Sequence, residues 1–480
     1  RKRNVFERSG LPPGYDIRPN RKRVSMKIPA LIFSLSLLCT ACGGGGGGAS
    51  TTPPAPIAQP PVFESPHPAT WETQSAADAG FDTAALEAAF GYAMADGSFT
   101  QAALVVKAGK LVDERYRGIA EGEVATITSL SSTPTAQDPA FWQNDFGSRD
   151  RDSLVTSWST AKSFTSILIG IAIEKGLING TSQPASDFIS EWQSDERSSI
   201  TIEQLLDMRS GLVPICFISE TGSAGECQNE SDGAAGGNIV FAQDQMSACI
   251  NRPLARDGAS YPWVSGGTYK AGEFLYANCD TQVLGEILYR ATGQDPGIFA
   301  ETELFEPLNI DAFWWRDNVE GGQSNGNYLT YCCLDSTARD FAKFGYLIQL
   351  GALELEGGRY YSNYIASVTA MSSFYDKQFW SFCGETNDDG ECVNTVIHTS
   401  GFDGQFIVID QKNDLVIVRT SLYQSYLNFS DERKMRLVPG LVAESNWTGS
   451  LPQAMAIPTT SSFSIREFHS RIVSALATGG

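Results

Sequence analysis

The order of β-rich and helical segments along the chain constrains its fold more than any other feature. Residues 101–118, QAALVVKAGKLVDERYRG, hold two β-rich runs around Ala108 and Gly109, and QFIVID and DLVIVRTSLY flank the turn residues 411–413 in the same way. A long, mostly helical middle lies between these two hairpins. This order predicts an α/β (α+β) fold, with one antiparallel sheet built from both ends of the chain, flanking helices and an inserted, mostly helical region.

Helical patterns accompany both predicted hairpins and fill the middle. Asp82 precedes a run with apolar residues at helical spacing that stops at Gly97, and SIREFHSRIVSALA, residues 464–477, places its apolar residues on one helical face. The middle contributes SFTSILIGIAIEKGLI, ITIEQLLDMRSGL, DTQVLGEILYRATG and TARDFAKFGYLIQLG. We therefore predict a single folded domain over residues 71–477.

The amino-terminal part resembles an export signal rather than a folded segment. Residues 26–41 begin with Met26 and a lysine, continue with an apolar run and end in small residues before Cys42. The run is too short to span a bilayer stably, and the six glycines that follow disfavour a buried strand or helix. Because the pattern is similar to a bacterial lipoprotein signal, we expect an exported lipoprotein, anchored to a membrane through Cys42 on the periplasmic side or at the outer membrane.

Two further segments flank this signal. Residues 1–25 are basic and irregular and begin with Arg, so we interpret them as an untranslated or disordered extension before a start at Met26. Residues 42–70 are rich in Gly and Pro and lack periodicity, which predicts a tether.

Charge and cysteine usage exclude several classes of function. The first 41 residues hold nine of the 35 Lys and Arg but two of the 55 Asp and Glu, so the rest is strongly acidic and nucleic acid is not an expected partner. Eight cysteines follow Cys42 without the Cys-x-x-Cys and His spacing of a zinc site, and we expect disulfides and no metal. Cys216 with Cys227 and Cys383 with Cys392 are plausible short-loop pairs, although sequence alone does not fix the connectivity.

The segment SWSTAKSFTSIL, residues 157–168, carries the strongest candidate for chemistry. Positions i and i+3 share a helical face, so the Lys162 amine can reach the Ser159 hydroxyl. A helix amino terminus and desolvation both disfavour an ammonium ion, which would lower the Lys162 pKa and make the amine a base. The Ser159 N–H in the first turn could donate to an oxyanion. The alternative is that Ser157 or Ser159 caps the helix and Lys162 is solvated.

Other catalytic patterns are missing. The chain has three histidines, His67, His398 and His469, and no Gly-x-Ser-x-Gly elbow, which disfavours a Ser-His-Asp hydrolase. It also lacks phosphate-cradling glycine loops and a dinucleotide fingerprint, so no cofactor is expected.

Beyond the Ser-x-x-Lys spacing, the chain resembles the serine β-lactamase and penicillin-binding protein superfamily. It is most similar to the class C-like branch, which also contains esterases and nylon-oligomer (aminohexanoate-dimer) hydrolases. Matching stretches occur in the family's order between Trp71 and Leu476: SWSTAKSFTSILIGIAIEKGLI, ITIEQLLDMRSGL, FLYANCDTQVLGEILYRATG, TARDFAKFGYLIQLG and SGFDGQFIVIDQKNDLVIVRT. The resemblance implies Ser159 as nucleophile and Lys162 as base.

The family's second motif, Tyr-x-Asn, matches Tyr276-Ala277-Asn278. The resemblance implies that Tyr276 shares the base role with Lys162 and protonates the leaving group, while Asn278 holds Lys162 and the substrate. A tyrosine beside a cationic amine would also have a lowered pKa and could shuttle a proton. The alternative is a core tyrosine with a satisfied hydroxyl.

The third motif, usually Lys-Thr-Gly, departs from the family. HTSGFDGQ fits with Gly401 at the family's glycine, which puts Thr399 and Ser400 at the Lys and Thr positions and makes Phe402 the second oxyanion donor. Alternatively His398 takes the lysine position, as in a His-Thr-Gly variant, or simply ends a loop before a strand. We prefer the first register. In both registers the lysine that would meet a β-lactam or peptide carboxylate is absent.

These features predict a serine hydrolase that cleaves a small-molecule ester, amide or peptide through an acyl-Ser159 intermediate. An ester or linear amide is the preferred substrate, and a β-lactam or D-alanyl-D-alanine cell-wall peptide is the alternative. A catalytically silent lipoprotein that binds peptide or cell-wall fragments is the alternative from another class.

Overall fold

The computed structural model describes residues 70–130, 137–213, 244–255, 257, 269–317, 326–351, 353–355, 358–360, 362–371, 373–422 and 461–476. All of them belong to one compact unit, residues 60–480. The predicted signal, the predicted lipidation site Cys42 and the predicted extension before Met26 lie outside the described residues, as does the predicted pair Cys216–Cys227.

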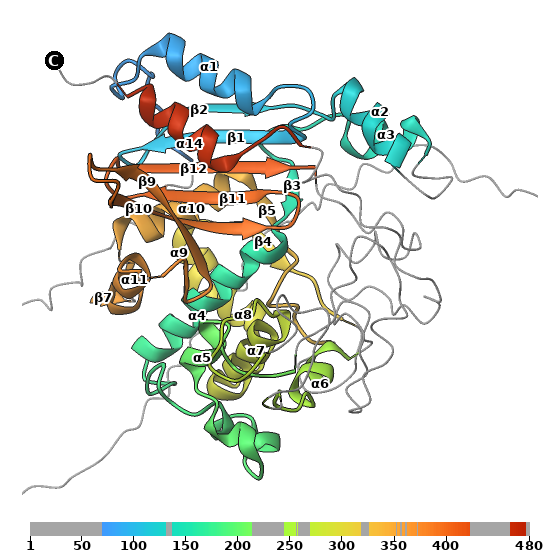
Figure 1. Ribbon diagram of the computed structural model, residues 1–480, viewed down its shortest axis with the longest axis vertical. Coiled ribbons are helices and arrows are strands. Elements are labelled where there is room, and N and C mark those ends of the chain that lie inside the picture. The colour runs from blue at the N-terminus through green and yellow to red at the C-terminus, as the bar shows by residue number, and fades with distance from the viewer. Residues whose placement is uncertain are drawn as a thin grey trace, which may run out of the picture. The chain divides into compact units, whose positions relative to one another are not determined.

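A seven-stranded antiparallel sheet forms the centre of the upper part of Figure 1, and its strand order is β2-β1-β12-β11-β10-β9-β8. The strands are β1 (Thr100–Lys107), β2 (Lys110–Tyr116), β8 (Tyr375–Asp376), β9 (Phe379–Thr386), β10 (Cys392–Gly401), β11 (Gln405–Asp410) and β12 (Leu415–Ser421). The first strand pairs with the last along most of its length, with Leu104 opposite Val418. The prediction of one sheet built from both ends of the chain is confirmed, and both predicted hairpins are present.

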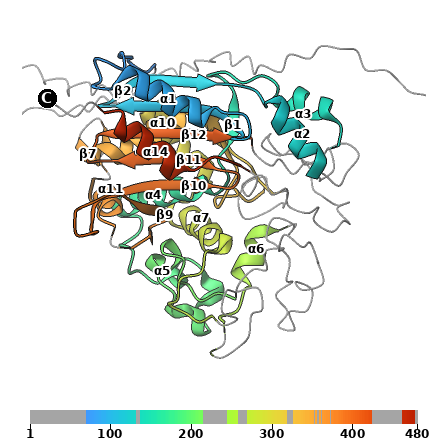
Figure 2. The same cartoon turned by 45° about the horizontal axis from the view of Figure 1, so that its top comes forward.

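Helices cover both faces of this sheet. Successive strand residues point to opposite sides, so each face presents side chains on which helices can pack. On one face lie α1 (Thr83–Ala93) and α14 (Ile465–Ser474), whose Phe90 and Phe468 rings pack 5.8 Å apart. As predicted, Asp82 caps α1 by accepting a 2.8 Å hydrogen bond from the Ala85 N–H. On the other face lies α10 (Ala338–Leu350), which Figures 1 and 2 show behind the strands. A Cβ added to its Gly345 would lie 2.6 Å from Val416 Cγ1, so glycine permits this close approach.

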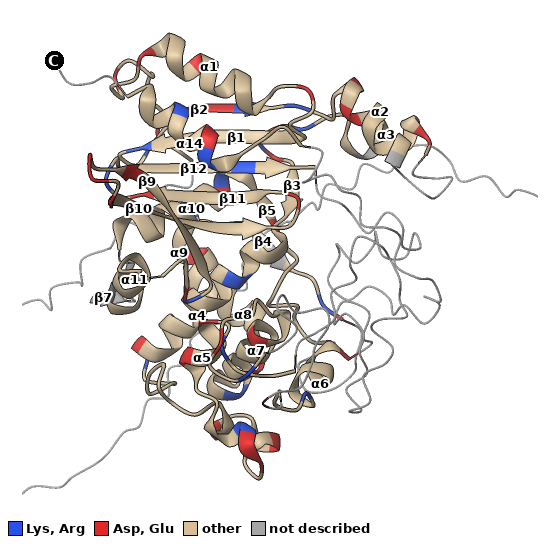
Figure 3. Ribbon diagram, viewed as in Figure 1, with Lys and Arg blue, Asp and Glu red and all other residues tan. Residues whose placement is uncertain are grey.

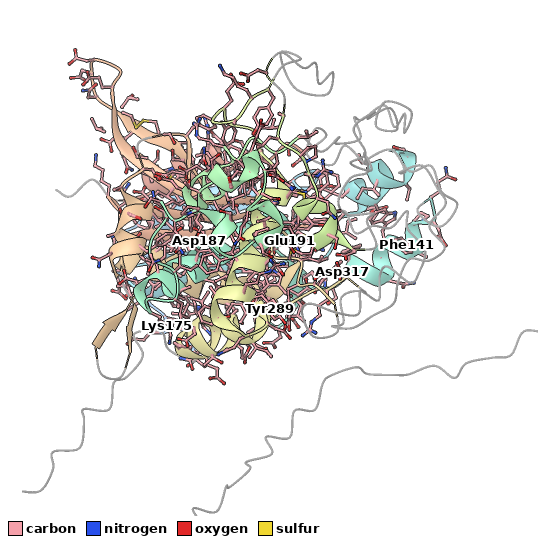
Figure 4. The ribbon with its side chains drawn as sticks, turned by 90° about the horizontal axis from the view of Figure 1, so that it is seen from below. Phe141, Lys175, Asp187, Glu191, Tyr289 and Asp317 are labelled. Atoms are coloured by element: carbon pink, nitrogen blue, oxygen red, sulfur yellow. A yellow bond between two sulfur atoms is a disulfide. The ribbon has the colours of Figure 1, made fainter. Side chains whose placement is uncertain are left out.

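The inserted region is mostly helical, as expected. Its longer helices are α4 (Ala161–Glu174), α7 (Asn278–Thr292) and α11 (Ser362–Thr369), with the short helices α5 (Ile202–Leu206), α6 (Gln245–Ile250), α8 (Pro296–Ala300) and α9 (Glu306–Leu308) and a π-helical turn Glu301–Phe305. α4 is almost wholly buried and packs on α7 and α11. Ion pairs join distant segments, including Lys175 with Glu303 at 2.7 Å and Arg290 with Glu191 at 2.8 Å. Figure 4 labels Lys175 and Glu191.

Small elements complete the described structure. β3 (Leu154–Thr156), β5 (Leu334–Thr337) and β4 (Ala312–Trp314) form a three-stranded sheet in the order β3-β5-β4, and β6 (Leu353–Leu355) pairs with β7 (Gly358–Tyr360). α2 (Glu121–Leu130) and α3 (Pro139–Phe146) share a separate apolar cluster, and 3₁₀ turns occupy residues 158–160, 185–187, 190–192 and 196–199.

Three disulfides connect described residues. The predicted pair Cys383–Cys392 is confirmed and joins β9 to β10. Cys249–Cys279 joins α6 to α7, and Cys332 is bonded to its neighbour Cys333; neither pair was predicted.

Acidic and basic residues are scattered along the described elements, as the coloured ribbon of Figure 3 shows. No described helix is long and apolar enough to cross a bilayer. Within the same ranges, no three His, Cys, Asp or Glu side chains gather where they could hold a metal ion.

Candidate active site

Ser159 and Lys162 lie where β3 turns sharply into α4. Trp158, the residue before Ser159, has a φ of 48°, in the left-handed region that non-glycine residues rarely adopt. The 3₁₀ turn Trp158–Thr160 then runs directly into the helix. Strained residues of this kind gather at functional sites, so the turn marks Ser159 independently of any motif.

The alternative of a capped helix with a solvated lysine is wrong. Lys162 is 1% exposed, and its Nζ lies 3.2 Å from Ser159 Oγ, within hydrogen-bond distance. Ser157 makes no side-chain capping bond; its Oγ accepts a 3.0 Å bond from the Leu334 N–H. The buried lysine and the partly exposed serine therefore form a hydrogen-bonded pair.

The surroundings of Lys162 favour its neutral form. Nζ also donates to Asn278 Oδ1 at 2.8 Å and to the Tyr331 carbonyl oxygen at 2.7 Å. Burial lowers the pKa of Lys162 well below its usual range, the direction that was predicted. A neutral amine has two N–H bonds and one lone pair, so with Asn278 and Tyr331 accepting the hydrogens the lone pair can face Ser159.

Tyr276 lies two residues before α7, and Asn278 is the first residue of that helix. Lys162 Nζ lies 5.0 Å from the centroid of the Tyr276 ring. Burial raises the pKa of Tyr276, and a hydrogen bond with Ser159 offsets only part of this rise. The prediction of a lowered pKa is therefore wrong, because a desolvated lysine does not supply the cation that would stabilise a phenolate. Tyr276 keeps its proton and is equipped to donate it.

The third motif contacts the turn that carries Ser159 through Thr399 and Gly401 at the end of β10. Thr399 Oγ1 lies 3.1 Å from Thr160 Oγ1, and a Cβ added to Gly401 would lie 2.2 Å from the Ser157 carbonyl oxygen. The Phe402 ring packs 5.8 Å from the Trp158 ring. Only glycine at position 401 lets the main chain of β10 come this close to the Ser157 carbonyl oxygen. This favours the register that aligns Gly401 with the family's glycine.

His398 lies on the opposite face of β10. Its ring packs 5.4 Å from Phe382 and 6.1 Å from Phe406, on the side covered by α14, and burial lowers its pKa to about 4. Ser400 pairs across the strands with Phe406 and, by strand alternation, points to the same side. The structure does not bring the side chain of His398 or Ser400 to Ser159.

A buried arginine, not foreseen from the sequence, holds the turn that carries Phe402. Arg419 in β12 donates to the carbonyl oxygens of Asp403 at 3.1 Å and Gly404 at 2.8 Å. It also donates to the Ser98 carbonyl oxygen at 2.6 Å and to Thr100 Oγ1 at 2.9 Å. A single side chain thus fixes the backbone of the third motif against β1.

An aromatic cluster adjoins Tyr276, and it was also not foreseen. The Trp380 ring lies 5.4 Å from the Tyr276 ring and 4.7 Å from the Tyr375 ring. Phe274 and Phe374 extend the cluster with their rings 5.0 Å apart, and Phe374 is 53% exposed. The signal in the sequence was the density of aromatic residues around positions 274–276 and 374–382.

Comparison of the sequence with known proteins identifies a family and a relative. A sequence profile of the Beta-lactamase family matches residues 86–436. The chain is 25% identical over 305 residues to a 6-aminohexanoate-dimer hydrolase of Paenarthrobacter ureafaciens, and the match covers 58% of this chain and 68% of the relative.

Two solved structures are similar at low identity. A class C beta lactamase from Rhodobacter sphaeroides matches with 14% identity and a TM-score of 0.46, over 74% of this chain and 97% of that one. A penicillin-binding protein homolog from Caulobacter crescentus matches with 16% identity and a TM-score of 0.48, over 77% and 98%. With the family profile covering well over half of the sequence, this chain belongs to the beta-lactamase family, within the serine β-lactamase and penicillin-binding protein superfamily.

Proposed function

We propose that this hydrolase cleaves an ester or a linear amide through an acyl-Ser159 intermediate. The observation that carries the proposal is the contact of a buried Lys162 amine with Ser159 Oγ at 3.2 Å. Among the described residues, no other serine hydroxyl is hydrogen-bonded to a lysine amine.

The proposed reaction needs only the groups already described. Lys162 Nζ takes the Ser159 proton as Oγ attacks the substrate carbonyl carbon, and the N–H groups of Ser159 and Phe402 stabilise the oxyanion. Tyr276 donates a proton to the departing alcohol or amine and regains one from Lys162. Water then attacks the acyl carbon with the same proton relay, which releases the acid and restores Ser159.

The substrate preference rests on three observations. Thr399, in place of a lysine, meets the nucleophile turn, so the third motif supplies no cation for a carboxylate at that position. The relative from Paenarthrobacter ureafaciens is named for a dimer of 6-aminohexanoate, which contains a linear amide. Trp380, which is partly exposed beside Tyr276, and the exposed Phe374 next to it favour an apolar group on the substrate.

Labelling with a fluorophosphonate probe tests the nucleophile. We expect the parent protein to be labelled and Ser159→Ala to remain unlabelled, while Ser153→Ala, six residues earlier, behaves like the parent. Equal labelling of Ser159→Ala and parent would contradict the role of Ser159. A parent that takes no label would instead support the silent binding lipoprotein.

A substrate panel tests the preference. We expect a nitrophenyl ester and a linear aminohexanoate amide to be turned over faster than a chromogenic cephalosporin. Faster turnover of the cephalosporin would favour the alternative of β-lactam or cell-wall peptide hydrolysis.

The proposed location is that of an exported lipoprotein held to a membrane through Cys42. The lipoprotein-like residues 26–41 and the Gly/Pro-rich segment 42–70 support it. Mass spectrometry of the protein expressed from Met26 in a bacterial host tests it, since a diacylglyceryl group on Cys42 is the expected finding.

A further inference from the structure

The disulfide between the neighbouring residues Cys332 and Cys333 lies directly beside the proposed catalytic pair. Both cysteines are 2% exposed, and the backbone at Cys333 has a φ of 64°, in the left-handed region. A bond between adjacent cysteines closes a small ring through their shared peptide, so it restricts the backbone of these two residues far more than an open chain would.

The residue before the disulfide binds the proposed base. The Tyr331 carbonyl oxygen accepts the 2.7 Å hydrogen bond from Lys162 Nζ, and the Tyr331 ring centroid lies 5.3 Å from the same nitrogen. The Tyr331 hydroxyl is itself bonded to Gln245 Oε1 at 2.8 Å. Tyr331 therefore contacts Lys162 through both its main chain and its ring.

The residue after the disulfide binds the turn that carries the nucleophile. The Leu334 N–H donates to Ser157 Oγ at 3.0 Å, and the Ser157 N–H donates to the Leu334 carbonyl oxygen at 2.7 Å. The Cys333 carbonyl oxygen accepts a further 2.9 Å bond from the Trp315 N–H. The disulfide-bonded pair thus connects Tyr331, whose carbonyl oxygen accepts from Lys162, to Leu334, which binds the turn that carries Ser159.

We propose that the Cys332–Cys333 disulfide is a positioning element for catalysis, which holds the Tyr331 carbonyl where it orients the Lys162 amine towards Ser159. This inference rests on the proposed function. It follows that a thiol reductant lowers turnover. Two electrons and two protons pass from a dithiol reductant to the Cys332–Cys333 bond, which opens to two cysteine thiols. The reductant is oxidised to its own disulfide.

The double variant Cys332→Ser/Cys333→Ser tests the proposal, with Cys383→Ser/Cys392→Ser as the matched control. The control removes a disulfide from the β9–β10 hairpin, where Cys383 and Cys392 are exposed. Fluorophosphonate titration counts active sites, and kcat and KM are then measured per site with a nitrophenyl ester. For Cys332→Ser/Cys333→Ser we expect an unchanged number of sites, a roughly 10- to 100-fold fall in kcat and a KM within about twofold of the parent, because misplacing a catalytic group by an ångström has effects of that size. The control should match the parent.

A parental kcat in Cys332→Ser/Cys333→Ser would overturn the proposal. A parent that takes no label would overturn the proposed function instead, so the two failures are distinguishable.

A second measurement covers the case in which that variant does not fold. The parent is partly reduced with dithiothreitol and alkylated, mass spectrometry gives the fraction of each disulfide opened, and turnover is measured on the same samples. Loss of kcat should follow the opening of Cys332–Cys333. Loss that follows Cys249–Cys279 or Cys383–Cys392, or no loss when Cys332–Cys333 is open, would overturn the inference.

Discussion

Lys162 Nζ lies 2.8 Å from Asn278 Oδ1, a contact between residues 116 positions apart in the chain. The bond joins α4 to the first residue of α7, so packing of these two helices brings the Ser-x-x-Lys and Tyr-x-Asn motifs into one site. The asparagine oxygen accepts one amine hydrogen, which leaves Lys162 free to use its lone pair on Ser159.

Replacing Lys162 by arginine or alanine should lower kcat/KM about 10²- to 10⁴-fold, because arginine stays protonated and alanine has no base. The pH profile of the parent gives an independent check. Since burial lowers the pKa of Lys162, activity should be lost only as the amine is protonated, well below the ordinary lysine pKa of about 10.4. Lys175→Ala, near the far end of the same helix, is the control. Loss of parental activity already near pH 10 as the pH falls would contradict the assignment.

Removing the Tyr276 hydroxyl should affect amides more than activated esters. Tyr276→Phe leaves no proton donor for an amine leaving group, so we expect kcat for a linear amide to fall about 10²- to 10⁴-fold. A nitrophenolate departs without protonation, and the ester rate should fall much less. Tyr375→Phe, whose ring packs 5.9 Å from the Tyr276 ring, is the matched control. Equal losses on both substrates would point to a structural role.

Truncating Phe374 should weaken binding of apolar substrates. The side chain is 53% exposed beside the aromatic cluster, so Phe374→Ala removes apolar area from a bound ligand rather than from the core. At about 25 cal/mol per Å² we expect a KM increase of roughly tenfold for a phenylacetyl ester and little change for the acetyl ester. Phe402→Ala, whose parent ring packs against Trp158 rather than in the aromatic cluster, gives a comparison. A parallel change in both KM values would argue against a specificity role for Phe374.

Arg419→Met should disturb the third motif and the sheet together. The variant leaves the carbonyl oxygens of Ser98, Asp403 and Gly404 without their buried donor, so we expect a loss of about 2–4 kcal/mol in the free energy of unfolding. In the fraction that stays folded, kcat should also fall, because the Phe402 N–H is no longer fixed. Urea denaturation and kinetics per titrated site measure the two effects. Arg115→Met, at a partly exposed ion pair, should cost less than about 1 kcal/mol.

Asp410 should contribute to stability above acid pH. Burial acts to raise the pKa of Asp410, but hydrogen bonds from His469, Asn413 and Asn394 outweigh it and lower the pKa to about 2. A carboxyl whose pKa is lowered in the folded state stabilises the protein above its unfolded pKa, near 3.9, and this contribution disappears as the pH falls towards 2. Asp410→Asn should therefore lower the free energy of unfolding by about 1–2 kcal/mol at pH 7, after allowance for screening, and by less near pH 3. Asp388→Asn, in the exposed β9–β10 turn, should change neither value.

The sequence by itself determined the local elements and the order in which they combine. Alternating apolar residues and turn residues predicted both hairpins, and the Asp82 cap predicted the start of α1, because these signals act between neighbouring residues. The spacing of Ser159 and Lys162 predicted their contact for the same reason, since one helical turn brings them together. The family motifs then named Tyr276, Asn278 and Gly401.

Only the tertiary structure decided how these residues are surrounded. The acceptor of the second Lys162 hydrogen is the main-chain carbonyl of Tyr331, 169 residues away. Every residue has such a carbonyl, so the pattern of side chains in the sequence does not predict which one binds Lys162. Successive residues of β10 point to opposite faces of the sheet, and only the packed structure decides which face lies towards α4. The place of His398 beside Phe382 could therefore not be predicted. Burial, which lowers the pKa of Lys162 and raises that of Tyr276, is a property of the packed core, because desolvation arises only when distant elements exclude water together.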